Sequence, residues 1–284
     1  MGKKTTEARE LTLAEIQHTG LEILKVVHEF CKENGIRYSL AYGTLLGAIR
    51  HKGFIPWDDD VDIMMPRPDY ERFCRTFRHN GYQVVYNGNR KDCLIAFARV
   101  CDTKDTFITS LCPWIRSSEN LGMWIDIFPL DGAPDDPAEM KELHSTAKDI
   151  RLRSDKSRRA LRPLFVKGES LGFNINTLKK RLFSLFTPKP EDYVQEMCRL
   201  CSSIPYGSTG HVSQLAFPNT FLHLNLSDFD SYTDVMFENT AFHAAVGYEN
   251  ILKTMYGDYM KLPPVEQRIP QQHYIRFYWK QNIR

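Results

Sequence analysis

The sequence has no uninterrupted apolar run long enough to cross a bilayer. Hydrophobic residues make up 42% of its 284 residues, but no stretch approaches the ~20 consecutive apolar residues that a spanning helix needs. The first ten residues, MGKKTTEARE, also have no apolar segment of the kind found in secretion signals. We therefore expect a cytoplasmic protein, with any membrane contact peripheral.

Disulfide frameworks and nucleic-acid binding are both disfavoured by the composition. The chain has seven cysteines, an odd number, and a protein kept in the cytoplasm does not normally build on disulfides. The formal net charge is only +2, so a uniformly cationic surface for nucleic acid is not indicated. There is no internal repeat and no low-complexity segment. The composition is that of a globular protein.

The small net charge conceals an uneven distribution. The segment from Lys148 to Lys189 has twelve Lys or Arg against three Asp or Glu, which makes it +9 and leaves the rest of the chain at −7. A basic segment of this kind predicts peripheral contact with an anionic membrane, where each cation near the surface adds ~1 kcal/mol. An exposed helical face or a binding surface for an anionic glycan is the alternative.

Apolar periodicity and turn residues predict an α/β (α+β) fold, a mixed sheet flanked by helices. Helices are expected at 12–34, 45–50, 137–160, 174–186, 191–203 and 247–256, with another opening at 66–69. Strands are expected at 37–42, 61–65, 82–87, 94–100, 106–110 and 123–128, with a β-like stretch at 211–238. We divide the chain into a catalytic core (1–134), a helical basic segment (135–210) and a C-terminal segment (211–284).

Four carboxylates fall within five residues in the run Asp58-Asp59-Asp60-Val61-Asp62. Side chains two apart in a strand point to the same side, so Asp60 and Asp62 should project together and Asp59 away from them. Carboxylates held so close repel one another unless a cation lies between them, and Mg²⁺ or Mn²⁺ suits oxygen ligands. A solvated acidic loop is the alternative. The apolar residues on both sides of the run instead place it at the edge of the core.

Two further features support a phosphate-transfer site. Asp126 lies within the apolar stretch Trp124–Phe128, and a lone buried carboxylate is costly unless it is paired or bound to a metal. We expect it to be a third metal ligand, with an arginine pair or a helix cap as the alternative, and we expect Asp131 in a turn beyond the strand. Gly43 and Thr44 occupy a strand-to-helix turn, where backbone N–H groups can approach a phosphate.

The stretch YGTLLGAIRHKGFIPWDDDVDIMMPRPDYERF, residues 42–73, resembles the signature of the LicD family. These are nucleotidyltransferase-fold enzymes related to fukutin and fukutin-related protein. The resemblance continues at 124–131, at 256–264 and at Arg268. It implies a nucleotidyltransferase-like core, with an active site that the C-terminal segment completes.

The reaction implied by the resemblance is the transfer of a phosphorylated alcohol, such as phosphocholine, from a CDP-activated donor to a glycan or lipid-linked glycan hydroxyl. CMP is the leaving group. By the same resemblance Asp60, Asp62 and Asp126 bind the metal, and Asp58 is the other acidic position of the motif. Gly43 and Thr44 are implied to meet the nucleotide phosphates.

Other side chains in these motifs are candidates for substrate contact. Candidates for phosphate binding are the cations Arg50, Lys52, Arg67 and Arg268, since guanidinium groups form bidentate contacts with phosphate. Ordinary surface cations are the alternative. Candidates for contact with the donor or acceptor are Trp57, Tyr256 and Asp258, with packing or turn formation as the alternative. Asp58 or Asp60 is the candidate to accept the proton of the attacking hydroxyl.

Three other functions share parts of this pattern. A nucleotidyltransferase acting on an NTP would use the same carboxylates but release pyrophosphate. A nucleotide-sugar glycosyltransferase also uses Asp-x-Asp with Mn²⁺, although its motif normally follows a longer nucleotide-binding unit. A non-enzymatic interaction module would not need the full set of carboxylates. The donor headgroup stays open among choline, ethanolamine, glycerol and ribitol.

Overall fold

The computed structural model describes residues 8–108, 120–160, 188–269 and 276–280. The α-helices of the described part are α1 (Leu13–Asn34), α2 (Tyr42–Arg50), α3 (Arg67–Thr76), α4 (Pro137–Ala160), α6 (Pro190–Cys201) and α7 (Tyr248–Tyr256). Two 3₁₀ turns, η1 (Leu226–Phe229) and η2 (Val265–Gln267), accompany them.

The main sheet has seven strands, and its central path runs β1-β2-β6-β4-β3. Its strands are β1 (Ser39–Leu40), β2 (Asp62–Pro66), β3 (Tyr82–Val85), β4 (Ala98–Asp102), β6 (Trp124–Ala133), β7 (His211–Ser213) and β8 (Leu224–Asn225). Strands β2 and β6 are parallel, and the other pairs are antiparallel. The sheet is therefore mixed, which confirms the predicted α/β fold class.

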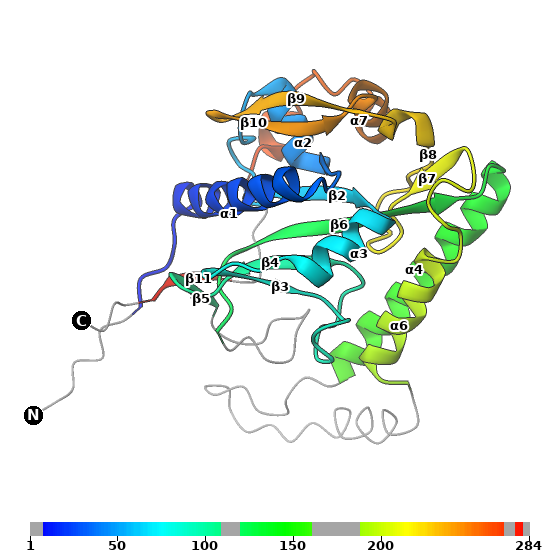
Figure 1. Ribbon diagram of the computed structural model, residues 1–284, viewed down its shortest axis with the longest axis horizontal. Helices are drawn as coiled ribbons and strands as arrows, with labels where there is room; N and C mark the ends of the chain where they lie inside the picture. The colour runs from blue at the N-terminus through cyan, green and yellow to red at the C-terminus, as the bar shows by residue number, and fades with distance from the viewer. Residues whose placement is uncertain (1–7, 109–119, 161–187, 270–275, 281–284) are drawn as a thin grey trace, which may run out of the picture.

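Two small sheets lie beside the main one. The hairpin β9 (Tyr232–Phe237) and β10 (Thr240–Ala245) forms a layer above the sheet together with α2 and α7 (Figure 1). Strand β11 (Phe277–Trp279) pairs with β5 (Thr106–Ile108). Helices α4 and α6 pack side by side at the end of the sheet formed by β7 (Figure 1). The C-terminal part of the chain thus surrounds the N-terminal core on two sides.

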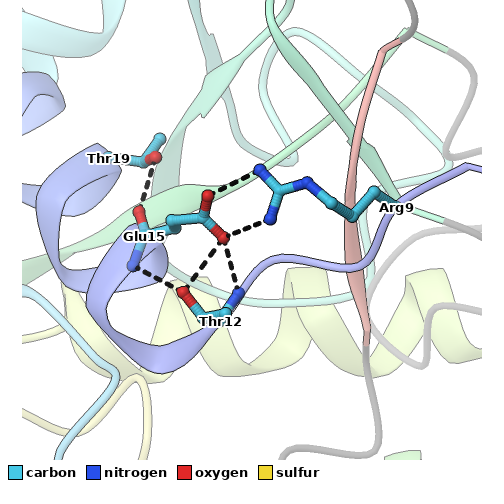
Figure 2. A network of polar contacts seen from close by, with 4 residues as sticks. All are labelled: Arg9, Thr12, Glu15 and Thr19. Carbon is cyan, nitrogen blue, oxygen red and sulfur yellow. Dashed lines mark hydrogen bonds and ion pairs between the residues drawn. The ribbon is translucent and has the colours of Figure 1, made fainter.

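Helix α1 begins and ends where local sequence signals predict. Thr12 and Glu15 form a capping box, in which each side chain bonds the other residue's backbone N–H. Figure 2 shows that the Glu15 carboxylate also binds Arg9 at 2.6 and 2.9 Å, while Thr19 donates to the carbonyl of Glu15. Gly35 ends the helix with φ 58°, a left-handed conformation that glycine adopts without strain. The apolar face of α1 is buried against the sheet.

Two sequence-based expectations about local structure are wrong. Asp131 does not lie in a turn, because β6 continues to Ala133 and buries its side chain completely, paired with Arg67. Gly43 and Thr44 do not precede α2, because the helix already begins at Tyr42. The two residues instead form its first turn, so their N–H groups still belong to a helix N-terminus.

Four other expectations concern the β-like stretch, one helix, the division of the chain and membrane spans. The stretch 211–238 contains only short strands and η1, and β9 is its longest strand. The predicted helix at 174–186 lies outside the described residues. The division at 134 and 210 stays a prediction, although β7 and β8 add strands to the same sheet as the core. None of the helices in the described ranges is both long and apolar enough to span a membrane.

Candidate functional site

Three charged side chains lie in one row across the main sheet. Asp62 on β2 is the register partner of Asp126 on the parallel strand β6, and Asp126 in turn faces Arg99 on β4. Neighbouring strands lie ~4.8 Å apart, so the two aspartates are neighbours by construction of the sheet. Arg99 donates to both carboxylate oxygens of Asp126, at 2.6 and 3.2 Å.

The loop before β2 brings further carboxylates to the same place. One oxygen from each of Asp58, Asp59 and Asp60 lies within 4.8 Å of the others. Asp62 is close enough to the loop that the charges of Asp60 and Asp58 raise its pKa, as described below. Within the described ranges, these three residues are the one group of three or more His, Cys, Asp or Glu side chains with metal-ligand spacing.

The predicted orientation of Asp59 is wrong. We expected it to point away from Asp60, because residues in a strand alternate. Strand β2 begins only at Asp62, so residues 58–60 belong to a loop and do not alternate. The Asp59 carboxylate therefore joins the acidic group, and its presence there gives no reason to call it dispensable.

Burial and mutual repulsion change the acidity of these groups. Burial, followed by the charges of Asp60 and Asp59, raises the pKa of Asp58 to about 7. Burial, with the charges of Asp60 and Asp126, raises the pKa of Asp62 well above its ordinary value. Both shifts come first from burial and then from the crowding of negative charge among these carboxylates. A cation placed among these oxygens would relieve that repulsion.

Asp126 is held by an arginine that the sequence analysis did not single out. The Arg99 guanidinium lies 4.3 Å above the Trp124 ring and 5.6 Å from the Phe97 ring, with 12% of its side chain exposed. This is the arginine pair that we weighed as the alternative role of Asp126. A pair does not exclude metal binding, because a carboxylate has several lone pairs. The sequence signal for this ion pair is a single charged residue, Arg99, within the otherwise apolar stretch 94–100.

The first turn of α2 lies directly against the acidic loop. A β-carbon at Gly43 would lie 2.4 Å from Oδ2 of Asp58, so only glycine permits this approach. The Thr44 hydroxyl is buried and accepts a hydrogen bond from the backbone N–H of Asp62 at 2.9 Å. Gln17 of α1 donates to the carbonyl of Asp58 at 2.8 Å. Two helices and β2 thus fix the position of the carboxylates.

The tip of the β9–β10 hairpin holds the same loop from the other side. The Glu238 carboxylate accepts from the N–H of Phe54 at 3.0 Å, and its own N–H donates to the carbonyl of Lys52 at 2.8 Å. The rings of Phe54 and Phe237 lie 4.7 Å apart, edge to face. The C-terminal segment therefore contributes directly to the shape of the loop, a contact that the sequence did not reveal.

Two of the predicted phosphate ligands lie together near the acidic group. Arg50 donates to the carbonyls of Tyr259 and Lys261, and the nearby charge of Arg268 helps to lower its pKa, after burial. Tyr256, at the end of α7, has a raised pKa because of burial and then the charges of Asp62 and Asp58. The structure thus brings Arg50, Arg268 and Tyr256 to one side of the carboxylates.

The other side chains predicted to contact substrate differ in exposure and in position along the fold. Lys52 and Asp258 are exposed, and Trp57 is half-buried with its ring 6.4 Å from that of His51. Arg67 lies at the far end of β2 from Asp62, roughly 16 Å away along the strand. Its guanidinium is held by Asp131 through two bonds of 2.6 and 2.7 Å. The structure therefore does not place Arg67 with the other phosphate candidates.

In the described part of the basic segment, several cations form ion pairs within the protein. On α4, Arg151 and Arg158 both pair with Asp155, and Arg153 pairs with Asp149 and Glu196. Residues 161–187 of the segment lie outside the described part. The six cysteines of the described ranges form no disulfide with one another, and none belongs to a cluster with metal-ligand spacing there.

Comparison with known proteins identifies relatives of this sequence. Residues 35–164 match the model of the LicD/FKTN/FKRP nucleotidyltransferase domain. Over 279 residues, 94% of the chain and 98% of the relative, the sequence is 33% identical to the lipopolysaccharide cholinephosphotransferase LicD of Haemophilus influenzae. It is also 39% identical to an uncharacterized protein of Rickettsia prowazekii over 94 residues, 31% of the chain and 35% of the relative. The domain match spans every carboxylate of the site.

Proposed function

Because the chain belongs to the LicD family, we propose that it transfers phosphocholine, or a similar phosphorylated alcohol, from a CDP-activated donor to a hydroxyl of a lipopolysaccharide or related glycan. The end-to-end similarity to a cholinephosphotransferase supports the coarser assignment, a transferase. The donor, the release of CMP and the metal dependence are the parts that we propose.

The observation that carries the proposal is a set of five aspartates near the first turn of α2. Asp62 and Asp126 are paired across two parallel strands, Asp58 lies against Gly43, and Asp59 and Asp60 lie beside Asp58 in the loop before β2. A helix N-terminus favours anions, whereas the carboxylates need a cation. A phosphate ester with its metal satisfies both requirements at once.

The donor set fits Mg²⁺ or Mn²⁺. All five candidate ligands offer carboxylate oxygens, which hard divalent cations prefer. Burial, and then repulsion from Asp60 and Asp126, raises the pKa of Asp62, and a bound cation would offset that repulsion. We assign the metal to Asp60, Asp62 and Asp126, as the family resemblance implies. Within the described ranges only Asp58, Asp59 and Asp60 already lie at metal-ligand spacing, so Asp62 and Asp126 would have to move towards the ion. When bound, it would neutralise the phosphate oxygens and help to align the displacement.

The chain's own residues have distinct proposed roles. Asp58, whose carboxylate lies against the first turn of α2, is the proposed acceptor of the proton of the attacking hydroxyl. Arg50 and Arg268 bind the donor phosphates, and the N–H groups of Gly43 and Thr44 face the same anion. Arg99 keeps Asp126 oriented. Tyr256, whose pKa is raised by burial and then by the charges of Asp62 and Asp58, is the proposed contact for the donor or acceptor.

Product analysis separates this proposal from its alternatives. The protein is incubated with Mg²⁺ and, in parallel, with CDP-choline, CDP-ethanolamine, CDP-glycerol and CDP-ribitol, each with and without lipopolysaccharide. Release of CMP that depends on the acceptor supports the proposal and identifies the headgroup. Pyrophosphate released from an NTP would instead establish a nucleotidyltransferase, and sugar transfer from a nucleotide-sugar a glycosyltransferase.

Peripheral contact with an anionic membrane accompanies the proposal through the basic segment 148–190. Its described cations on α4 are largely paired, so we assign the contact to the segment as a whole rather than to that helix face. Co-sedimentation with vesicles should increase with their content of anionic lipid and fall with added salt.

A further inference from the structure

Gln214 is buried in a way that glutamine seldom is. It lies directly after β7 within the buried run 212–216, and only 1% of its surface is exposed. Its amide group has two N–H donors and an acceptor oxygen to satisfy, which is why glutamine is mostly found at protein surfaces. Its presence in the core therefore requires a partner for those atoms.

The described ranges of the chain supply one such partner. The carboxamide oxygen accepts a hydrogen bond from the phenol of Tyr42 at 2.8 Å, whereas the amide nitrogen Nε2 has no partner within the described part of the chain. Turning the amide over would exchange the two atoms and leave the oxygen unpartnered instead. A buried donor without an acceptor destabilises the folded chain, because the donor has lost its hydrogen bonds to water.

Tyr42 connects this amide to the candidate active site. It is the first residue of α2, directly before Gly43, and it has φ 45°, a strained value for a bulky residue. Its ring packs edge-on against Phe128 at 5.3 Å. Burial, and then the negative charge of Asp62, raises the pKa of its phenol, so the ring lies within electrostatic range of the acidic group.

We propose that Gln214 is a substrate-binding residue, whose amide N–H donates to an acceptor oxygen of the bound nucleotide donor. The inference rests on the proposed function and extends it to a residue of the C-terminal segment. A strained tyrosine and an unsatisfied amide would both be retained because the ligand completes the hydrogen bonding. The same amide would reject ligands that lack the oxygen, since its donor would then stay buried and unpaired.

Two substitutions test this role by ligand binding rather than by turnover. Gln214→Glu keeps the shape and an acceptor for the Tyr42 phenol but removes the N–H donor, and Gln214→Leu removes both. Calorimetric titrations with CMP and with phosphocholine, each with Mg²⁺, should show roughly 10- to 100-fold weaker binding of one ligand by both variants. Loss of CMP binding places the acceptor oxygen on the nucleotide half, and loss of phosphocholine binding places it on the headgroup half.

Ser213→Ala is the matched control, because Ser213 is equally buried but donates to the carbonyl of Leu222. It should lower stability and leave both affinities unchanged. If the wild type binds CMP and both Gln214 variants match it for both ligands, the inference fails while the proposed function stands. If the wild type binds neither ligand, both fail. If Gln214→Glu unfolds at a much lower urea concentration than Ser213→Ala, with unchanged affinities, Gln214 is structural.

Discussion

Asp62 and Asp126 occupy the same level of two neighbouring parallel strands, so the sheet itself sets their separation. The backbone N–H of each aspartate also donates a hydrogen bond that helps to fix its position. The N–H of Asp62 donates to Thr44, and the N–H of Asp126 donates to the carbonyl of Val61. A site built on paired strands keeps its geometry without help from loops. The loop carboxylates Asp58–Asp60 then add to a fixed pair.

The first prediction concerns that pair. Asp62→Asn and Asp126→Asn should each lower the rate of CMP release by roughly 10³-fold or more, because each removes a charge that the metal needs. Both variants should remain folded, since asparagine keeps the shape. Asp149→Asn, on the exposed face of α4, is the control and should leave the rate unchanged. Turnover near the wild-type level by either variant in saturating Mg²⁺ would contradict the assignment.

A second prediction follows from the contact between α2 and the acidic loop. Gly43→Ala would bring a β-carbon to 2.4 Å from Oδ2 of Asp58, and the carboxylate, being the end of a side chain, moves more easily than the helix. We expect a large loss of activity with little loss of thermal stability. Gly207→Ala is a control with the opposite expected outcome. A β-carbon at Gly207 would have no atom within 4 Å, but Gly207 has a positive φ that alanine adopts only with strain. This substitution should cost stability and spare activity.

The third prediction concerns pH and the metal-free protein. In the folded chain the pKa of Asp58 is about 7, against an ordinary value of 3.8. The folded state therefore holds this proton more tightly than the unfolded state does. Its stabilising contribution is complete below pH 3.8 and is lost as the pH rises through 7. Urea unfolding in EDTA should show this decline between pH 4 and 7, and Asp58→Asn should make it shallower, leaving the decline due to the raised pKa of Asp62. Equal pH dependence in both proteins would contradict the shift.

A fourth prediction addresses the buried pair at the other end of β2. Breaking the pair by Arg67→Met leaves Asp131 buried without its partner, which should lower the free energy of unfolding by about 3–5 kcal/mol. Adding Asp131→Leu removes the uncompensated charge, so the double variant should recover much of that loss. Urea denaturation measures both, and the double variant should still release CMP. If Arg67→Met instead weakens donor binding and leaves stability unchanged, Arg67 binds phosphate after all.

The features that the sequence predicted well are local ones. The capping box of Thr12 and Glu15 and the glycine at position 35 set the ends of α1, because each acts through residues a few positions away. The apolar residues around Asp60 and Asp62 correctly placed the acidic run at the edge of the core. The family signature in 42–73 supplied the rest of the assignment.

What the sequence missed depends on contacts between distant segments. The pairing of Arg67 with Asp131 spans 64 residues, and that of Tyr42 with Gln214 spans 172. No local pattern reports such contacts, so Asp131 was assigned to a turn and Gln214 was overlooked. The orientation of Asp59 failed for a different reason. Asp59 lies in the loop before β2, which begins only at Asp62, so the alternation of side chains in a strand does not extend to it.

The contact between Glu238 and Phe54 has a consequence for how the protein is made. The two residues are 184 positions apart, so at a synthesis rate of ~5–20 residues per second Glu238 leaves the ribosome about 10–40 s after the loop that it holds. During that interval the acidic loop has emerged without the hairpin that fastens it. The nascent chain therefore carries its full set of aspartates well before it carries a finished catalytic centre.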